Sequence, residues 1–289
     1  MVTITSRCKL DLKQNYLVMR SSDDETKRVY LDEISILMIE STAVSITGCL
    51  LSELAKRKIK VIFCDSSRDP CAELVQYYGS YDCSGKIQRQ IKWNSETKGL
   101  VWSEIVAEKI RKQAEHLEMV GKGGVAELLK KYIGEIEFAD KSNREGHAAK
   151  VYFNALFGMD FTRGSGGAVN AALDYGYKLL SSAFSREIVA NGYLTQLGIF
   201  HCSTTNPFNL ASDIMEPYRI LVDIRVRECN FKIFEKEQKH IMLDMLNTMV
   251  KIDGTKQFLI NSIKIYCRGF FDAMNENDAS LLKFYSYEL

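Results

Sequence analysis

Short apolar runs separated by polar breaks characterise the first part of the chain. Segments such as VTITS, YLVMR, ISILMIE and KVIFC are rich in β-branched residues, as expected of strands. The breaks between them are polar, as in SSDDETK, or contain Pro70 or Gly79. One helical pattern, over residues 47–58, interrupts the strands. Because several runs follow one another without a crossover helix, the pattern favours an antiparallel or mixed sheet.

Beyond residue 80 the apolar positions recur with helical rather than strand-like spacing. A polar stretch, GSYDCSGK, is expected to link the two regions, and segments such as VWSEIVAEKIRKQAEHLEMV then place apolar residues at i, i+3 and i+4. Asn143 is expected to cap one of these helices, and Pro217 either to kink another or to mark its first turn. We therefore predict an α+β fold, a small β-rich domain followed by a larger all-α domain. The predicted divisions are a β-rich domain at 1–79, a linker with a first helix at 80–94, and a helical domain at 95–289.

The charges of the chain are nearly balanced. Its 289 residues include 38 Lys and Arg against 37 Asp and Glu, so it lacks the excess of a strongly basic nucleic-acid binder, and any DNA-binding surface must be local. Local clusters of Lys and Arg are most often solvated helix faces. Three are present: Lys86, Arg89 and Lys92; Lys109, Arg111 and Lys112; Arg225, Arg227 and Lys232.

Cysteine spacing and hydropathy favour a cytoplasmic protein. The eight cysteines are scattered, without the CxxC pairs or the Cys/His spacing of zinc sites. The N-terminal stretch MVTITSRCKLDLK lacks the apolar segment of a signal peptide. No run approaches the roughly 18 consecutive apolar residues of a membrane span. We therefore expect reduced thiols and no membrane segment.

Glycine-rich segments and three of the four histidines give little indication of function. In GSYDCSGKI the glycines are too far apart for a phosphate-binding loop, and no Ser or Thr follows the lysine. His116 and His240 lie in charged helical stretches and are expected on solvated faces, while His147 and Glu145 lie on different sides of one helix. His201 follows an apolar stretch in GIFHCSTTNPF, and taken alone it is best explained as a buried, hydrogen-bonded histidine.

Three carboxylates raise a question of charge compensation. In LASDIMEPYR the apolar residues recur at helical spacing, and Asp213 and Glu216, three residues apart, lie on one side of the same helix. Glu145 likewise lies along an apolar stripe of its helix. Carboxylates that face a core are costly unless a positive group compensates them. The sequence therefore predicts a cation close to these side chains.

Two kinds of cation explain the pattern equally well. A divalent ion would neutralise converging carboxylates, and mixed carboxylate and imidazole ligation suits Mg²⁺ or Mn²⁺, with the histidine favouring Mn²⁺. The alternative is a buried salt-bridge network. In that network Glu145 would pair with Arg144, Lys150 or Arg219.

Three separated segments resemble one protein family. SNREGHAAKVYFNALFG, NAALDYGYKLL and LGIFHCSTTNPFNLASDIMEPYRILVD look like signature segments of the CRISPR adaptation integrase, the universal spacer-acquisition nuclease of CRISPR systems. NREGHAA together with NPFNLASDIMEP is closest to its type II branch. The similarity runs in order along nearly the whole chain. It implies a short N-terminal β domain that dimerises and a C-terminal helical domain that holds the active site.

The resemblance also implies roles for individual residues. The positions that match the metal-binding and catalytic residues of the family are Glu145, His201 and Glu216. Asp213, one turn before Glu216, matches an acidic position that supports the site. Arg144 and Arg219 neighbour these carboxylates, and one of them is expected to contact the scissile phosphate or to pair with a site carboxylate.

The implied activity is that of a metal-dependent endonuclease and integrase, in which a 3′-hydroxyl of spacer DNA attacks a phosphodiester at the edge of a CRISPR repeat. The family acts on double-stranded DNA as a homodimer, with a small ferredoxin-fold partner protein in a heterohexamer. Two other functions stay open, a hydrolytic metal-dependent nuclease and a non-catalytic DNA-binding scaffold. Without metal, loss of a carboxylate should be neutral or stabilising at a metal site and destabilising in a scaffold.

Overall fold

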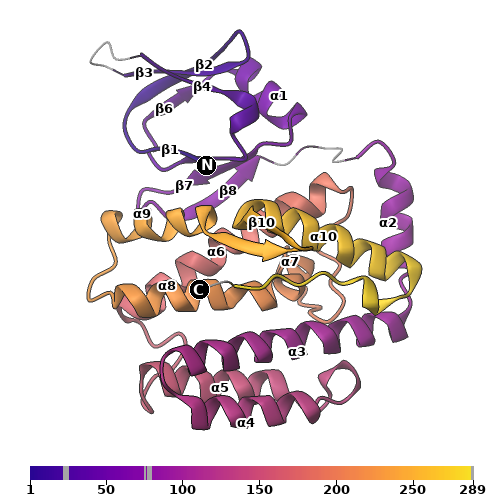
Figure 1. Ribbon diagram of the computed structural model, residues 1–289. Helices are drawn as coiled ribbons and strands as arrows, with labels where there is room; N and C mark the ends of the chain where they lie inside the picture. Colours follow the sequence, from indigo (N-terminus) through magenta and orange to yellow (C-terminus); the bar gives the residue numbers. More distant parts are fainter. Residues whose placement is uncertain (22–25, 75, 77–79, 288–289) are drawn as a thin grey trace. The chain divides into compact units, whose positions relative to one another are not determined.

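A computed structural model describes residues 1–21, 26–74, 76 and 80–287, and it divides the chain into two compact units (Figure 1). The first comprises Met1–Cys83 with Val189–Gly192, and the second comprises Ser84–Ile188 with Tyr193–Leu289. The predicted boundary at residue 79 and part of the SSDDETK break lie outside the described residues.

The first unit contains two mixed four-stranded sheets, one of the two sheet types that the strand-like runs predict. In one sheet, in the order β1-β5-β7-β8, the first three strands are parallel and β8 is antiparallel to β7. In the other, in the order β4-β3-β2-β6, only the β2–β6 pair is parallel. The strands are β1 (Val2–Ile4), β2 (Cys8–Lys13), β3 (Tyr16–Ser21), β4 (Thr26–Tyr30), β5 (Ile36–Ile39), β6 (Val44–Ile46), β7 (Lys60–Cys64) and β8 (Pro70–Leu74).

One helix completes the core of this unit. Helix α1 (Gly48–Lys56) begins where the Thr47 hydroxyl accepts a hydrogen bond from the Leu50 N–H, at 3.4 Å. Leu50 and Leu54, one turn apart, are fully buried and belong to the same apolar cluster as Leu37 and Val61 of the strands. The predicted helix at 47–58 is therefore confirmed, and its apolar face is what holds it on the strands.

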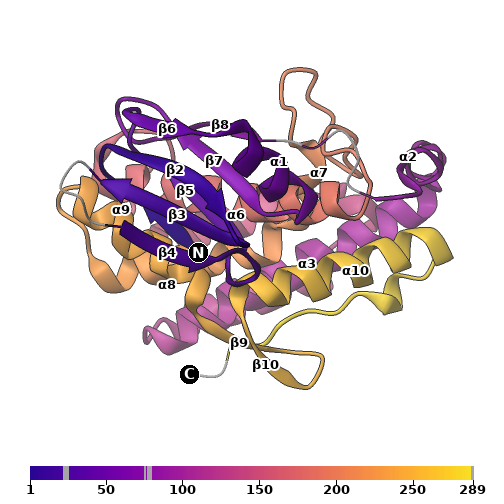
Figure 2. The same cartoon turned by 90° about the horizontal axis from the view of Figure 1, so that it is seen from above.

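The second unit is mostly helical and is built around one long helix. Helix α3 packs against α4, α5, α8 and α10, and Figure 2 shows α10 running along it. Asn94 caps α3 by accepting the Glu96 N–H at 2.8 Å. The helices are α2 (Cys83–Ile91), α3 (Ser95–Met119), α4 (Gly123–Gly134), α5 (Arg144–Phe157), α6 (Gly167–Ala190), α7 (Asn209–Ile214), α8 (Arg219–Cys229), α9 (Lys236–Asp244) and α10 (Leu259–Glu276).

The order of strands followed by helices confirms the α+β prediction, with two local differences. The GSYDCSGK stretch is not wholly a linker, since α2 starts at Cys83. The second unit is not all-α, because β9 (Met249–Ile252) and β10 (Thr255–Phe258) form an antiparallel hairpin, visible in Figure 2. Asp253 and Gly254 supply the two positive φ angles, +50° and +75°, that a tight hairpin turn of this kind requires. Within the described residues, no helix has both the length and the apolar character that crossing a membrane demands.

Candidate active site

The first turn of α5 presents Glu145, but its cap differs from the prediction. Asn143 has a left-handed backbone, with φ of +52°, and its side chain makes no cap hydrogen bond. Asp140 takes that role: its two carboxylate oxygens accept the N–H groups of Arg144, at 2.8 Å, and Glu145, at 3.0 Å. A carboxylate here also complements the positive end of the helix dipole. The start of α5, and with it the position of Glu145, is therefore fixed from outside the helix.

Pro217 interrupts the predicted helix that carries the other two carboxylates. Helix α7 ends at Ile214, a single 3₁₀ turn spans Glu216–Tyr218, and α8 continues from Arg219. Proline has no N–H to donate to a regular helix, which explains a break at this point. The Pro217 carbonyl instead accepts a hydrogen bond from the Tyr285 hydroxyl, at 3.1 Å. The turn buries Glu216 and packs against α3.

The cation that the acidic residues require is Lys109, on α3. Its Nζ pairs with Glu145 Oε1 and lies 2.5 Å from Glu216 Oε2. The second oxygen of Glu216, Oε1, lies 3.0 Å from Nη2 of Arg219. Both oxygens of the buried carboxylate are thus engaged by cations. The prediction that Glu145 pairs with Arg144, Lys150 or Arg219 is wrong. Among the described residues, Glu145 forms its ion pair with Lys109.

These contacts set the protonation of the cluster. Burial alone would raise the pKa of Glu216, but Arg219 and Lys109 outweigh it and hold that pKa below its ordinary value. Burial would likewise lower the pKa of Lys109, yet Glu216 and Glu145 raise it. The glutamate is therefore ionised and the lysine charged at neutral pH. Lys109 and Lys112 are buried, so the predicted surface cluster of Lys109, Arg111 and Lys112 does not form as such.

Asp213 is fully buried and organises the loop that carries His201. Its two oxygens accept the backbone N–H groups of Ile199, Phe200 and His201, at 2.6, 3.1 and 2.9 Å. His201 Nδ1 donates to the same carboxylate at 2.5 Å. Gly198 is required here, since a Cβ would lie 2.4 Å from the His201 carbonyl oxygen. Asp213 therefore positions His201 rather than joining the Glu145–Glu216 pair.

The environment of His201 leaves one ring nitrogen available. The hydrogen bond to Asp213 raises the pKa of the imidazole, and the charge of Glu216 adds to that effect. Because Nδ1 is held by Asp213, Nε2 is the nitrogen that remains for a ligand. The indole of Trp102, on α3, stacks on Phe200 with centroids 4.3 Å apart and meets the His201 ring edge-on at 5.8 Å. Helix α3 thus supports the imidazole as well as compensating the carboxylates.

The structure brings some of the predicted site residues together and separates others. Glu145 and Glu216 converge, Arg219 joins them, and Asp213 holds His201. Arg144 lies elsewhere: its guanidinium contacts Glu135 at 3.0 Å and lies 5.3 Å from the Tyr132 ring centroid. Over the part of the chain that is described, no three Asp, Glu, His or Cys side chains form a group arranged to hold a metal ion. Lys109 lies between the two glutamates instead.

Sequence reasoning missed two residues of this site, both on α3. Trp102 and Lys109 are seven positions apart, which places them on one face of the helix. The helical spacing of VWSEIVAEKI was recognisable, but a lysine next to a charged patch is normally solvated. What identifies Lys109 is its burial beside two glutamates from other elements, which the local pattern does not contain.

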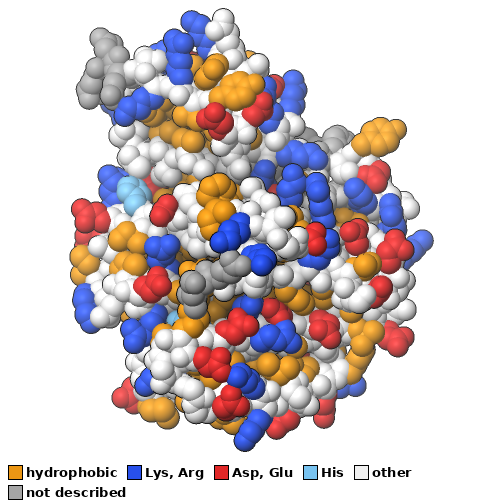
Figure 3. Space-filling view, viewed as in Figure 1, with side chains coloured by type: hydrophobic (Ala, Val, Ile, Leu, Met, Phe, Trp, Pro, Cys, Tyr) orange, Lys and Arg blue, Asp and Glu red, His pale blue; other side chains and the backbone are white. Residues whose placement is uncertain are grey.

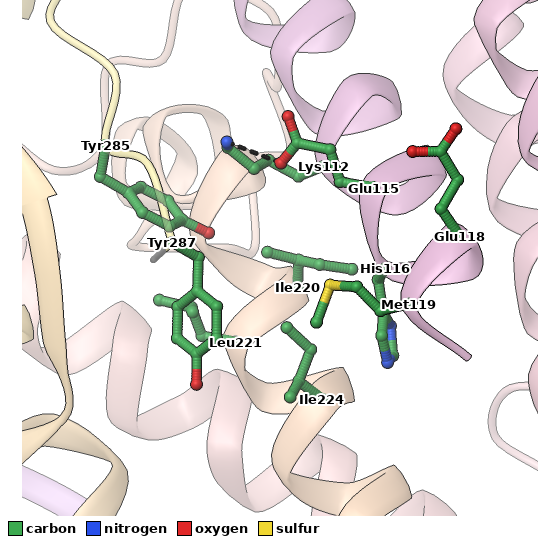
Figure 4. Close-up of a pocket in the computed structure, with 10 residues that line it drawn as sticks. All are labelled: Lys112, Glu115, His116, Glu118, Met119, Ile220, Leu221, Ile224, Tyr285 and Tyr287. Atoms are coloured by element: carbon green, nitrogen blue, oxygen red, sulfur yellow. Dashed lines mark hydrogen bonds and ion pairs between the residues drawn. The ribbon is translucent and has the colours of Figure 1, made fainter. Parts of the chain in front are cut away.

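A separate pocket lies between α3, α8 and the C-terminal segment (Figure 4). It measures about 240 Å³, and its lining includes His116, Ile220 and Tyr285 but none of the predicted site residues. The prediction that His116 lies on a solvated face is wrong. The side chain is buried, and its Nδ1 lies 2.7 Å from the Tyr152 hydroxyl. Its helix is covered on several sides, so the charges near it in sequence do not mark an exposed face.

Comparison with known proteins gives a consistent result. The family described as "CRISPR associated protein Cas1" matches residues 1–260. The CRISPR-associated endonuclease Cas1 of Neisseria meningitidis serogroup C (strain 8013) is 37% identical over 218 residues, which are 75% of this chain and 71% of that protein. A CRISPR-associated endonuclease Cas1 of Francisella tularensis subsp. novicida (strain U112) is 25% identical over 284 residues, 89% of this chain and 87% of that one.

Solved structures share the fold. A CAS1 protein from Thermotoga maritima superimposes with a TM-score of 0.72 at 16% identity, covering 95% of this chain and 97% of that one. A casposase bound to integration product gives a TM-score of 0.71 at 17% identity, over 97% and 93% of the two chains. A chain of a Cas6-RT-Cas1--Cas2 complex, of which this chain spans 36%, gives 0.74 at 16% identity. With a family match over most of its length, and with the strand-then-helix fold of these structures, the chain belongs to the CRISPR-associated protein Cas1 family.

Proposed function

We propose that this protein is a metal-dependent DNA endonuclease and integrase of CRISPR adaptation, in the cytoplasm. It would join the 3′-hydroxyl of spacer DNA to the repeat by transesterification, in which one P–O bond forms, one breaks and no water is consumed. The observation that carries the proposal is the convergence of Glu145 and Glu216, from two different elements, on a single cationic point. Assignment to the type II branch stays a prediction.

The donor set fits a divalent cation. The Lys109 ammonium marks a position where both carboxylates already hold a positive charge. The charge of Glu216 helps raise the pKa of His201, and Asp213 engages Nδ1 of that ring rather than Nε2. Glu145, His201 and Glu216 would hold Mg²⁺ or Mn²⁺, with the imidazole favouring Mn²⁺. When bound, the ion would stabilise charge on the phosphoryl oxygens and help ionise the attacking hydroxyl.

The remaining residues would act around that site. Asp213 keeps His201 in one orientation and one tautomer. Arg219 is a better candidate than Arg144 for contact with the scissile phosphate, because it already reaches Glu216 whereas Arg144 pairs with Glu135. A planar guanidinium can donate two hydrogen bonds to a phosphate. If Arg219→Ala leaves strand transfer and DNA affinity unchanged, this assignment is wrong.

We further propose double-stranded DNA, a second copy of the chain and a small ferredoxin-fold protein as partners, the last in a heterohexamer. Structures with the same fold bear the titles "Cas6-RT-Cas1--Cas2 complex" and "Crystal structure of TtCas1-DNA complex". Lys and Arg side chains are distributed among acidic ones over the helical unit on the face in Figure 3, so DNA contact would combine local charges. Affinity for duplex DNA should then fall steeply with salt.

A branched DNA that mimics a half-integrated spacer tests the proposal. With Mg²⁺ or Mn²⁺, the protein should resolve the branch into a rejoined duplex, and EDTA should stop the reaction. Glu145→Gln and His201→Ala should abolish it, whereas Glu127→Gln, in an exposed ion pair on α4, should not. Rejoining that persists in both site variants would refute the assignment of these residues.

The products and the stabilities separate the two alternatives. Shortened strands without rejoining would identify a hydrolytic nuclease with water as nucleophile. The stability of a carboxylate variant without metal no longer distinguishes a metal site from a scaffold. Lys109 compensates the two glutamates, so Glu145→Gln would deprive the lysine of one ion-pair partner and destabilise the protein in either case. Mn²⁺ binding distinguishes the two functions instead, because a scaffold would bind no ion at the Glu145–Glu216 pair.

A further inference from the structure

The Glu145–Glu216 cluster is electrically complete without a divalent ion. Two glutamates face two cations, Lys109 and Arg219, and the three ion pairs among them engage both oxygens of Glu216. The side chains of Glu216 and Lys109 are only 5% and 9% exposed. Adding a doubly charged ion to this group would leave two uncompensated positive charges in a region that water reaches poorly, which is strongly unfavourable. Departure of one resident cation would reduce this excess to a single positive charge, so we expect a cation to leave when a divalent ion enters.

The two resident cations are not held equally. Arg219 has a planar guanidinium that lies over the Tyr177 ring, 4.9 Å from its centroid, in addition to its contact with Glu216. Lys109 has a single ammonium on a flexible four-carbon stem, and its two ion-pair partners are the proposed ligands themselves. Its Nζ occupies the point where Glu145 Oε1 and Glu216 Oε2 converge. Lys109 is accordingly the group that a divalent ion would displace.

We propose that Lys109 is a built-in competitor for the metal, a positioning residue that holds Glu145 and Glu216 together until a divalent ion takes its place. The inference rests on the proposed function, in which these two glutamates bind the ion. In the metal-free protein the ammonium keeps the buried Glu216 carboxylate close to the partly exposed Glu145 carboxylate. The same contact lowers the affinity for the ion, because it must be broken before the ion can be bound.

Metal binding to the 289-residue chain tests the proposal, because the proposal predicts that loss of the Lys109 charge strengthens binding. Lys109→Met keeps the length of the side chain and removes its charge. Calorimetric titration with Mn²⁺ should give a dissociation constant at least about tenfold lower in this variant than in the wild type, since hydrogen bonds to charged groups no longer need to be broken. An unchanged or higher dissociation constant would overturn the proposal, because a lysine that helps to build the site would weaken binding when lost.

Lys130 provides a matched control on the same chain. Its Nζ lies between Glu118 and Glu127, at 2.6 and 2.9 Å, but all three side chains are largely exposed. Lys130→Met should leave the Mn²⁺ dissociation constant unchanged. A fall of the same size in both variants would mean that net charge alone acts on the titration, and it would overturn the proposal.

Lysine labelling of the wild type gives an answer even if Lys109→Met does not fold. Acetic anhydride acetylates free amines, and mass spectrometry measures the rate at each lysine. Saturating Mn²⁺ should raise the rate at Lys109 several-fold and leave Lys130 unaffected, because only Lys109 loses its carboxylate partners. Equal protection of Lys109 with and without Mn²⁺ would overturn the proposal.

Failure of the inference and failure of the proposed function give different results. If the wild type binds Mn²⁺ and Glu145→Gln with Glu216→Gln abolishes that binding, the metal site stands, and the Lys109 experiments judge the inference alone. If the wild type does not bind Mn²⁺, or the double variant binds it as well as the wild type, the proposed metal site is wrong and the inference falls with it.

Discussion

Two lysines of the helical unit each form ion pairs with two glutamates, but they differ in their burial and therefore in the expected effect of losing them. Lys109 bridges Glu145 and Glu216, and Lys130 bridges Glu118 and Glu127. Lys109 is buried among α3, α5 and the turn before α8, whereas Lys130 lies on the exposed face of α4. Water reaches the Lys130 side chain, which is 46% exposed, far more readily than the Lys109 side chain, which is 9% exposed.

The comparison teaches that the number of ion pairs does not indicate their importance. Exposed pairs gain little, because water and salt screen them and two long side chains lose freedom. A buried carboxylate pair without its cation is severely destabilised. The Lys109 cluster must therefore stay compensated in every state of the protein, either by the lysine or by another cation, and this requirement is what connects the fold to the proposed chemistry.

The largest expected difference between the two clusters is in catalysis. Glu216→Gln should reduce strand transfer on branched DNA by about a thousandfold or more, because it removes a proposed ligand whose ion contributes several kcal/mol to the transition state. Glu118→Gln, in the exposed cluster, should leave the rate unchanged. Equal rates for the two variants would remove the functional distinction between the clusters.

Stability without metal should differ next. Lys109→Met should lower the free energy of unfolding by about 3 kcal/mol, since Glu145 and Glu216 lose their shared counter-ion in a buried setting. Lys130→Met should have no measurable effect. Urea denaturation in EDTA makes the measurement. A Lys109→Met protein as stable as the wild type would show that the buried pair is better hydrated than its exposure indicates.

A second buried set, His116, Tyr152 and Asp223, sharpens the comparison through pH. Burial, with a contribution from Arg227, lowers the pKa of His116 from 6.5 to about 4, so its share of stability is lost as the pH falls through that interval. Burial raises the pKa of Asp223 from 3.8 to about 6, so its share is lost as the pH rises through that range. The two effects oppose each other between about pH 4 and 6.

Single substitutions should therefore separate the two opposing contributions to the pH dependence of stability. Relative to the wild type, His116→Gln should gain stability as the pH falls from 6.5 to about 4, and Asp223→Asn should gain it as the pH rises from 3.8 to about 6. Each change should amount to roughly 3 kcal/mol, at 1.36 kcal/mol for each unit of pKa. Urea denaturation at a series of pH values measures both. Parallel profiles for wild type and variants would mean that these groups do not titrate as their burial implies.

The smallest expected difference concerns salt. Any low-salt contribution of Lys130 should vanish near 1 M NaCl, where the Debye length is about 3 Å. The effect of Lys109→Met should persist, because buried charges are screened much less. Equal salt sensitivity of the two variants in denaturation experiments would contradict the distinction between a buried and an exposed bridge.

Local patterns in the sequence are enough to predict the classes of structure and the residues at which chemistry is expected. Periods of two and of 3.6 residues distinguished the strand-rich first unit from the helical second unit, because each period follows from local backbone geometry. The same reasoning identified Glu145, Asp213 and Glu216 as carboxylates in need of a cation. It does not predict the hairpin of β9 and β10, which lies, with its Asp253-Gly254 turn, inside the region expected to be all-α.

Only the tertiary structure decided which cation answers those carboxylates and which of them converge. Lys109 lies 36 residues from Glu145 and 107 residues from Glu216, so no local pattern relates them. Asp213, only three residues before Glu216 in the sequence, faces the His201 loop instead. The physical reason is that helical periodicity specifies which face of a helix is buried, whereas the packing of one helix on another specifies which charges meet there, and burial then determines how strongly they act.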